Sequence, residues 1–256
     1  MKIFFRALCS LSLLIGLGAG HVAASPVDPP AADPVPLLTT EEIVTRMVGR
    51  NLERARALGA YQGTRVYRLE YHGFPGSRSA DMVVEMKYRS PRTKDFTVRS
   101  QHGSKLIIDR IFNRMLQTEK EALDAENQSR VALNQDNYQF VLVGSESLPT
   151  GPAYILSVEP RTENKLLYRG RIWVDAGDFA VVRIEAAPAK NPSFWTKDTK
   201  IEQVYGKVGN FWLPVFNRSS SEVRLGGHAS FTIEYQDYQI TEATPLHRPG
   251  ELAGYP

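Results

Sequence analysis

Histidines are the first residues to consider for metal binding or acid–base catalysis. The sequence holds five of them, at His21, His72, His102, His228 and His247. None lies close enough in sequence to another to match the spacing of zinc ligands, and there is no H-E-x-x-H motif. We therefore expect no metal site and no cofactor.

Nucleophilic catalysis has no local motif either. The only cysteine, Cys9, lies inside an apolar N-terminal run rather than just after it, so neither thiol catalysis nor a lipoprotein anchor is expected. No G-x-S-x-G elbow and no phosphate-binding loop occurs. The sequence predicts that the protein is not an enzyme. The alternative is an envelope enzyme acting on lipid or glycan, whose site would need convergent polar groups with shifted pKa values.

Two groups of carboxylates could be considered for cation binding. Asp175 and Asp178 flank Ala176-Gly177, which is typical of a hairpin turn and offers too few ligands for calcium. The second group lies on a highly charged helical segment without a histidine, so we expect these side chains to be solvated. This second group consists of Glu119, Glu121, Asp124 and Glu126.

The N-terminus has the pattern of a secretory signal. Lys2 and Arg6 precede an apolar run over residues 7–19, which is shorter than the roughly 20 residues of a transmembrane helix. The small side chains of Val22-Ala23-Ala24 suit a signal peptidase. We expect residues 1–24 to be a signal peptide, cleaved after Ala24, and the mature protein to be periplasmic.

Length and composition are those of a globular chain. Of the 256 residues, 42% are hydrophobic and 23% are charged, which excludes the disordered and collagen-like classes. Lys plus Arg number 31 and Asp plus Glu 28, and the basic residues form no tail or stripe, so we expect no nucleic-acid binding. The composition predicts a proline-rich linker at 25–38, one domain at 39–241 and a disordered tail at 242–256.

Helical periodicity appears twice. Thr39 and Glu42 form a capping-box pattern, apolar residues follow at helical spacing, and Gly59 suits the end of that helix. The arginines within 46–56 lie on its other side, where we expect a solvated face; contact with anionic lipid is the alternative. A second helical patch covers residues 110–123.

Elsewhere the apolar residues alternate, as expected for an antiparallel sheet with hairpin turns. The alternation begins near residue 63 and includes residues 106–108. Its phase breaks at Gln236 and Asp237, which predicts a β-bulge that lets the sheet curl. About eleven strands and two to three helices predict an α+β fold, an incompletely closed antiparallel β-barrel covered or plugged by the helices.

One predicted strand is apolar on both faces. Phe211 and Leu213 alternate with Trp212 and Phe216, and such a strand must be covered on both sides. This pattern alone favours ordinary core packing. The alternative is an apolar cavity inside the curled sheet.

Motifs in the second half of the chain resemble the LolA/LolB-like family of outer-membrane lipoprotein-sorting proteins. They are the hairpin Leu167–Asp175 with its Gly170 and Trp173-Val174-Asp175, the segment Tyr-Gly-Lys-Val-Gly-Asn-Phe-Trp-Leu-Pro at 205–214, and residues 233–238. The resemblance covers residues 40–240. It implies an unclosed antiparallel barrel capped by helices, whose apolar interior holds acyl chains without a cofactor.

The resemblance also implies a function. We expect a periplasmic carrier of lipid or lipoprotein acyl chains, monomeric, that meets a membrane-protein partner only transiently. The family also contains regulators, so an envelope sensor or interaction module is the alternative. Strand alternation gives the residues expected to line the acyl cavity, which are Met82, Val84, Met86, Phe96, Val98, Trp173, Phe211 and Leu213.

Overall fold

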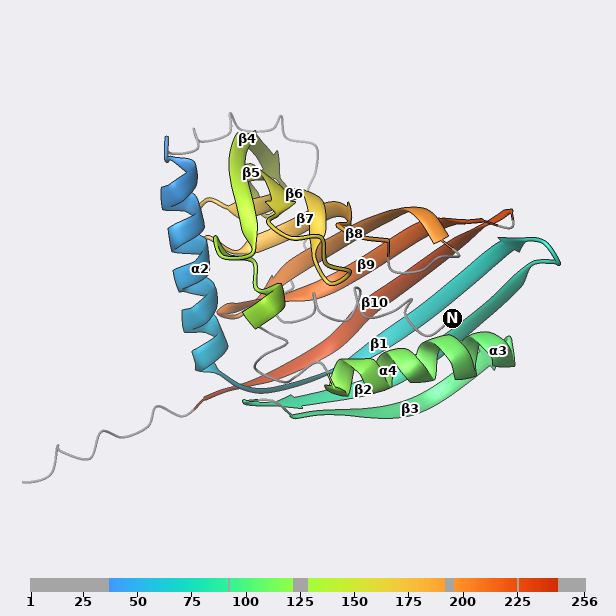
Figure 1. Cartoon of the computed structure of the whole chain (residues 1–256). Helices are drawn as coiled ribbons and strands as arrows, with labels where there is room; N and C mark the ends of the chain where they lie inside the picture. Colours follow the sequence, from blue (N-terminus) through green and yellow to red (C-terminus); the bar gives the residue numbers. More distant parts are fainter. Residues whose placement is uncertain (1–36, 92, 122–128, 192–195, 225, 244–256) are drawn as a thin grey trace, which may run out of the picture.

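One open antiparallel sheet forms the body of the protein (Figure 1). The computed structural model describes residues 37–91, 93–121, 129–191, 196–224 and 226–243. Its ten strands follow the order β3-β2-β1-β10-β9-β8-β7-β6-β5-β4, so β3 and β4 are free edges and the barrel is not closed. The expected fold class is confirmed, with ten strands in the described ranges where about eleven were predicted.

The elements follow one another in a simple meander interrupted by helices. The strands are β1 (Leu58–Gly73), β2 (Arg78–Arg89), β3 (Thr93–Gly103), β4 (Tyr138–Leu148), β5 (Gly151–Pro160), β6 (Tyr168–Asp175), β7 (Val181–Pro188), β8 (Thr196–Val208), β9 (Phe211–Val223) and β10 (Gly227–Glu242). The helical segments are α2 (Thr40–Ala57), α3 (Lys105–Ile107), the π-helix η1 (Ile108–Phe112) and α4 (Asn113–Glu121). None of these helices is both long and apolar enough to cross a membrane.

Helix α2 begins as its sequence predicts. The Thr39 hydroxyl accepts a hydrogen bond from the Glu42 backbone N–H at 3.3 Å, and the Glu42 carboxylate accepts one from the Thr39 N–H at 2.8 Å. This reciprocal capping box satisfies backbone donors that have no partner within the helix. On the basic side of the helix, Arg46 lies over the Phe179 ring, and Arg54 donates to the carbonyl of Asp178. Part of the face that we expected to be solvated therefore contacts the turn before β7.

The end of α2 differs from the prediction. The helix stops at Ala57, and Leu58-Gly59 already belongs to β1. A Cβ at Gly59 would lie 2.9 Å from the backbone of Glu242 and Ala243. Gly59 is therefore required by the close approach of β10, and it does not act as a helix stop.

The second helical region is longer than predicted. Residues 106–108 were expected to be strand, but they belong to α3 and η1. That prediction was wrong because a short apolar run fits a buried helix and a buried strand equally well. Ile107 and Ile108 are buried against Phe112 and the sheet.

One cross-strand row shows which side chains share a face. Each residue in it lies directly opposite the next on the neighbouring strand, and such residues point to the same side of the sheet. From β5 to β2 the row reads Leu156, Ile172, Ile184, Gln203, Asn217, Ile233, Tyr67 and Met82. We call the face that carries this row the inner face.

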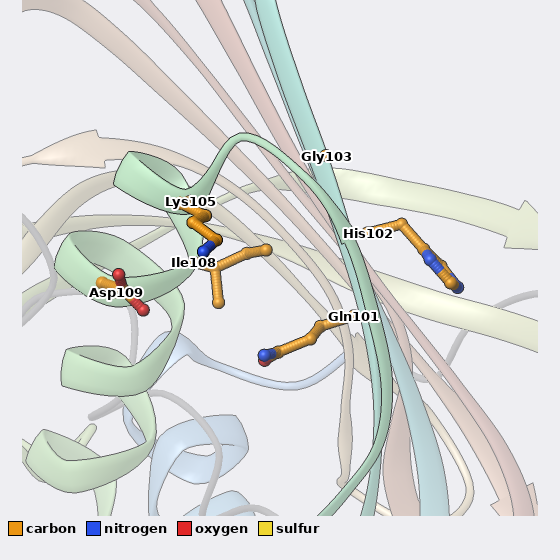
Figure 2. Close-up of a pocket in the computed structure, with 6 residues that line it drawn as sticks. All are labelled: Gln101, His102, Gly103, Lys105, Ile108 and Asp109. Carbon is orange, nitrogen blue, oxygen red and sulfur yellow. The ribbon is translucent and has the colours of Figure 1, made fainter.

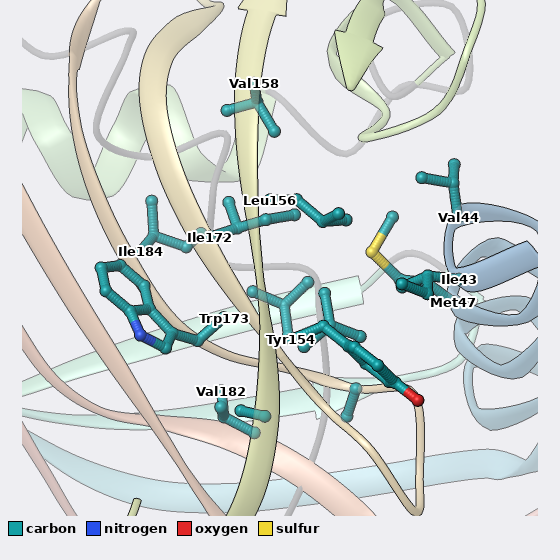
Figure 3. Packing of buried hydrophobic residues seen from close by; sticks show 14 of the residues in the cluster. Ile43, Val44, Met47, Tyr154, Leu156, Val158, Ile172, Trp173, Val182 and Ile184 are labelled. Atoms are coloured by element: carbon teal, nitrogen blue, oxygen red, sulfur yellow. The ribbon is translucent and has the colours of Figure 1, made fainter. Parts of the chain in front are cut away.

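Helices cover both ends of the inner face. The first cluster joins Ile43 and Met47 of α2 to Leu156, Ile172 and Ile184 (Figure 3). In Figure 1, α2 stands beside β4 and β5, whereas α3 and α4 lie along β1, β2 and β3. The two helical units thus pack on opposite ends of one face.

The other end of the inner face forms the second cluster, where Phe112 and Met115 pack on Tyr67, Met82 and Ile233. A third cluster joins residues of β1, β2 and β9. It consists of Leu58, Tyr61, Met86, Tyr88, Phe211 and Leu213.

The register of β1 and β10 shifts at the predicted bulge. Gln62 of β1 pairs with Gln239, but Thr64 pairs with Gln236, so β10 has one extra residue. Asp237 has a φ of 56°, in the left-handed region that irregular strand positions adopt. The bulge predicted near Gln236 and Asp237 is confirmed.

The role of Gly59 can be tested by adding one methyl group. We expect Gly59→Ala to lower the free energy of unfolding by about 1–3 kcal/mol, because the Cβ would meet the backbone of β10. Gly49→Ala is the matched control, since nothing lies within 4 Å of a Cβ there and Ala favours a helix by roughly 0.5–1 kcal/mol. Urea unfolding measures both. Equal effects of the two changes would contradict this explanation.

Candidate functional site

Most of the expected cavity-lining residues belong to two clusters or pack against them. Met82 and Val84 belong to the second cluster, and Met86, Phe211 and Leu213 belong to the third. Phe96 packs against both clusters. The structure therefore divides these six side chains, from β2, β3 and β9, between two clusters that meet at Phe96. Only the second cluster contains residues of α3, η1 and α4.

The remaining two expected residues lie apart from these two clusters. Val98 is opposite Val84, but it stands on the edge strand β3 and is 42% exposed. Trp173 pairs with Ile155 and Arg183, which places it in a different row from Ile172 and on the other face. Its indole N–H donates to the Glu146 carboxylate at 2.7 Å. The sequence could have shown this, because Ile172 and Trp173 are adjacent in β6 and adjacent strand residues point to opposite faces.

A buried ionic group fixes α4 to the sheet. The Glu119 carboxylate accepts hydrogen bonds from Arg65 Nη1 at 2.8 Å, Arg65 Nη2 at 3.1 Å and Lys94 Nζ at 2.8 Å. All three side chains are almost fully buried. The expectation that Glu119 is solvated was wrong, because two cations on β1 and β3 offset the cost of removing its charge from water.

The protonation of this group follows from its surroundings. Burial by itself would raise the pKa of Glu119, but the charges and hydrogen bonds of Arg65 and Lys94 lower it to about 2. Desolvation acts to lower the pKa of Lys94, and the Glu119 carboxylate reverses this and raises it. All three groups are therefore charged at neutral pH. One carboxylate faces two cations, so the group has an excess positive charge.

Sequence reasoning missed this group, although a signal for it was present. Tyr67 and Leu69 are the buried apolar residues of one phase of β1, and Arg65 stands two residues before Tyr67 in the same phase. Lys94 likewise stands two residues before Phe96 on β3. A cation on the apolar phase of a strand predicts a buried partner, because an isolated buried charge is strongly unfavourable.

A pocket lies where the inner face reaches the edge strand (Figure 2). Its volume is about 380 Å³, and its lining includes Gln101, Lys105, Ile108 and Asp109. Gln101 lies opposite Met82, so the pocket continues the cross-strand row onto β3. In Figure 2 the His102 side chain points away from the helix, on the other side of the strand.

Cation binding has no support in the described part of the chain. No group of three or more His, Cys, Asp or Glu side chains there is placed to hold a metal ion. The Asp175 carboxylate accepts hydrogen bonds from the backbone N–H groups of Gly177 at 3.0 Å and Asp178 at 2.6 Å. These bonds close the turn that the sequence predicted. Asp124 and Glu126 lie outside the described residues.

The buried ionic group gives a prediction for stability. We expect Glu119→Gln to lower the free energy of unfolding by about 3–5 kcal/mol at pH 7, because it leaves two buried cations without a counter-charge. Glu53→Gln is the control. Glu53 pairs with Arg50 on an exposed helix surface, and its loss should change stability by less than about 1 kcal/mol.

The same variant should show a distinct pH dependence. The folded pKa of Glu119 is below its ordinary value of 4.5, so its contribution is present above pH 4.5 and is lost as the pH falls toward 2. Urea unfolding between pH 7 and pH 2.5 should show the difference between wild type and Glu119→Gln narrowing below about pH 4.5. A difference that stays constant over this range would contradict the assignment.

The matches to known proteins come from solved structures. No family model matches the chain, and no curated protein matches it. Among solved structures, a DUF1329 family protein from Desulfovibrio piger is 15% identical, over 78% of this chain and 92% of that one, with a TM-score of 0.39. A LolA superfamily protein from Nitrosomonas europaea is 10% identical, over 81% and 96%, with a TM-score of 0.35.

A third solved structure is a protein described as an outer membrane lipoprotein-sorting domain, from Vibrio parahaemolyticus. It is 11% identical, over 82% of this chain and 96% of that one, with a TM-score of 0.39. The chain is similar to these three solved structures.

Proposed function

We propose that the protein binds the acyl chains of a lipid or lipoprotein between the inner face of the sheet and the helices that cover it. The observation that supports this proposal is the open sheet with two apolar clusters, each of which includes helix residues packed against strand residues. A chain held there would gain about 0.8 kcal/mol for each buried methylene. No covalent chemistry and no cofactor is required for such binding.

The proposed lining combines residues of the second and third clusters. It consists of Met82, Val84, Met86, Phe96, Phe211 and Leu213, with Val98 at its exposed rim. The buried side chains of these clusters pack against one another. An acyl chain that enters must therefore replace contacts between the helices and the sheet. Met82 and Met86 suit this exchange, because methionine side chains adapt to ligands of varied shape.

The proposed location of the protein is the periplasm, on the basis of the signal peptide that the sequence predicts. Residues 1–36 lie outside the described residues, so the signal peptide stays a prediction, as do the linker and the tail. We propose that the exported protein carries its ligand through the periplasm as a monomer and meets membrane proteins only briefly. An envelope sensor that uses the same face for a lasting partner is the alternative.

The proposal can be tested without choosing a ligand in advance. The chain starting at Ser25 is purified from the periplasm without detergent, measured by native mass spectrometry, and extracted with organic solvent. We expect a bound lipid mass that the extract accounts for. A chain that carries no lipid and binds no fluorescent acyl probe would contradict the proposal. A stable complex with a periplasmic segment of a membrane protein would then support the sensor.

The proposed lining can be tested with one charged substitution. We expect Val84→Arg to abolish binding of a fluorescent acyl probe, because Val84 is fully buried on the inner face and a guanidinium there excludes a hydrocarbon chain. Leu213→Arg should act in the same way. Val141→Arg is the control, since Val141 is 58% exposed on β4. Undiminished binding by a folded Val84→Arg variant, as judged by circular dichroism, would disprove this lining.

A further inference from the structure

The apolar row across the inner face is interrupted at its centre. Gln203 of β8 lies directly opposite Asn217 of β9. Their outer neighbours in the row are apolar, Ile184 on β7 and Ile233 on β10. Since β8 and β9 have four strands on either side in the sheet order, the two amides separate the apolar halves of the inner face.

These amides are buried and incompletely paired. Gln203 is 1% exposed and Asn217 is 2% exposed. Among the described residues, neither Gln203 Oε1 nor Asn217 Oδ1 has a hydrogen-bond partner. Nearby on the same strands, the Thr199 and Ser221 hydroxyls bond to each other at 2.8 Å. The sheet can therefore pair polar groups at this depth. Within the described part of the chain, the two amide oxygens nevertheless lack a donor, and the buried Thr196 hydroxyl of β8 also lacks a partner.

Buried unpaired acceptors lower the stability of the folded chain. Leucine would fill similar space and continue the apolar row without that loss. The positions of the two oxygens indicate a donor that the free chain does not supply. Both side chains lie on the face where we propose that the acyl chain binds, so the ligand is the source of that donor.

The charged groups on the same face of the sheet limit the chemical class of this donor. Arg65 and Lys94 already face a single carboxylate, Glu119, and Arg65 stands two residues from Tyr67, a member of the row. A further cation would be repelled by the excess positive charge. A hydroxyl or an amide N–H supplies a donor without charge.

We propose that Gln203 and Asn217 bind a neutral hydroxyl or amide N–H within an acyl ligand. The ligand class is then a hydroxylated or amide-linked acyl chain, with apolar parts that extend over both halves of the inner face. This inference rests on the proposed function, because it names the substrate class of the same site. The two amides act as specificity residues for that ligand.

The test compares acyl ligands that differ in the donor. Palmitate, 3-hydroxypalmitate and N-myristoylglycine each displace a fluorescent acyl probe from the chain starting at Ser25. We expect the hydroxylated or the amide ligand to bind about tenfold more tightly than palmitate. A tenfold difference in affinity corresponds to the contribution of about one buried hydrogen bond. The ligand that shows the preference identifies which donor is recognised.

Variants then assign the preference to the two amides. In Gln203→Leu/Asn217→Leu we expect palmitate to bind as before and the tenfold preference to disappear. The melting temperature of the free variant should rise, because two unpaired polar groups are removed. Gln239→Leu is the control, since this exposed amide on β10 pairs with Gln62, and it should leave the preference unchanged.

The possible failures are distinguishable. Palmitate binding without any preference in the wild-type chain would overturn this inference and leave the acyl-carrier proposal standing. A preference that survives in the double variant would also overturn it. A wild-type chain that binds none of the three ligands or the probe would overturn the proposed function itself. The wild-type comparison needs no variant, so the folding of the double variant does not limit the test.

Discussion

The antiparallel register decides which side chains of this protein can meet. Directly opposed residues share a face, and the pairings from β5 to β2 carry one row without a break across eight strands of the sheet. The row places Leu156 and Met82 on the same face although they lie at opposite ends of the fold. Because both ends of that face are apolar, each requires a cover. Helix α2 supplies one cover, and α3, η1 and α4 supply the other.

Polar groups interrupt this face in two different ways. Arg65 and Lys94 both donate to the Glu119 carboxylate, so they anchor α4 through charge and hydrogen bonds. Gln203 and Asn217 retain acceptors without partners among the described residues. The first group explains how a helix stays on the sheet. The second is best explained by something that the free chain lacks, which is why we assign it to ligand recognition.

Local patterns predicted several elements because their causes are local. The capping box at Thr39 depends on residues three apart, and the bulge at Asp237 appears as a break in alternation. Residues 106–108 were misassigned because a short apolar run does not distinguish a strand from a helix. Trp173 was assigned to the lining from strand alternation, whereas the register of β6 places it in a different row from Ile172.

The sequence by itself determined the antiparallel sheet class and the presence of two helical regions. These follow from side-chain periodicity, which is a property of neighbouring residues. Only the tertiary structure decided that Glu119 of α4 meets Arg65 and Lys94, and that Gln203 lies opposite Asn217. The reason is physical: such contacts join residues far apart in the chain, and strand order and register, which no local pattern specifies, bring them together.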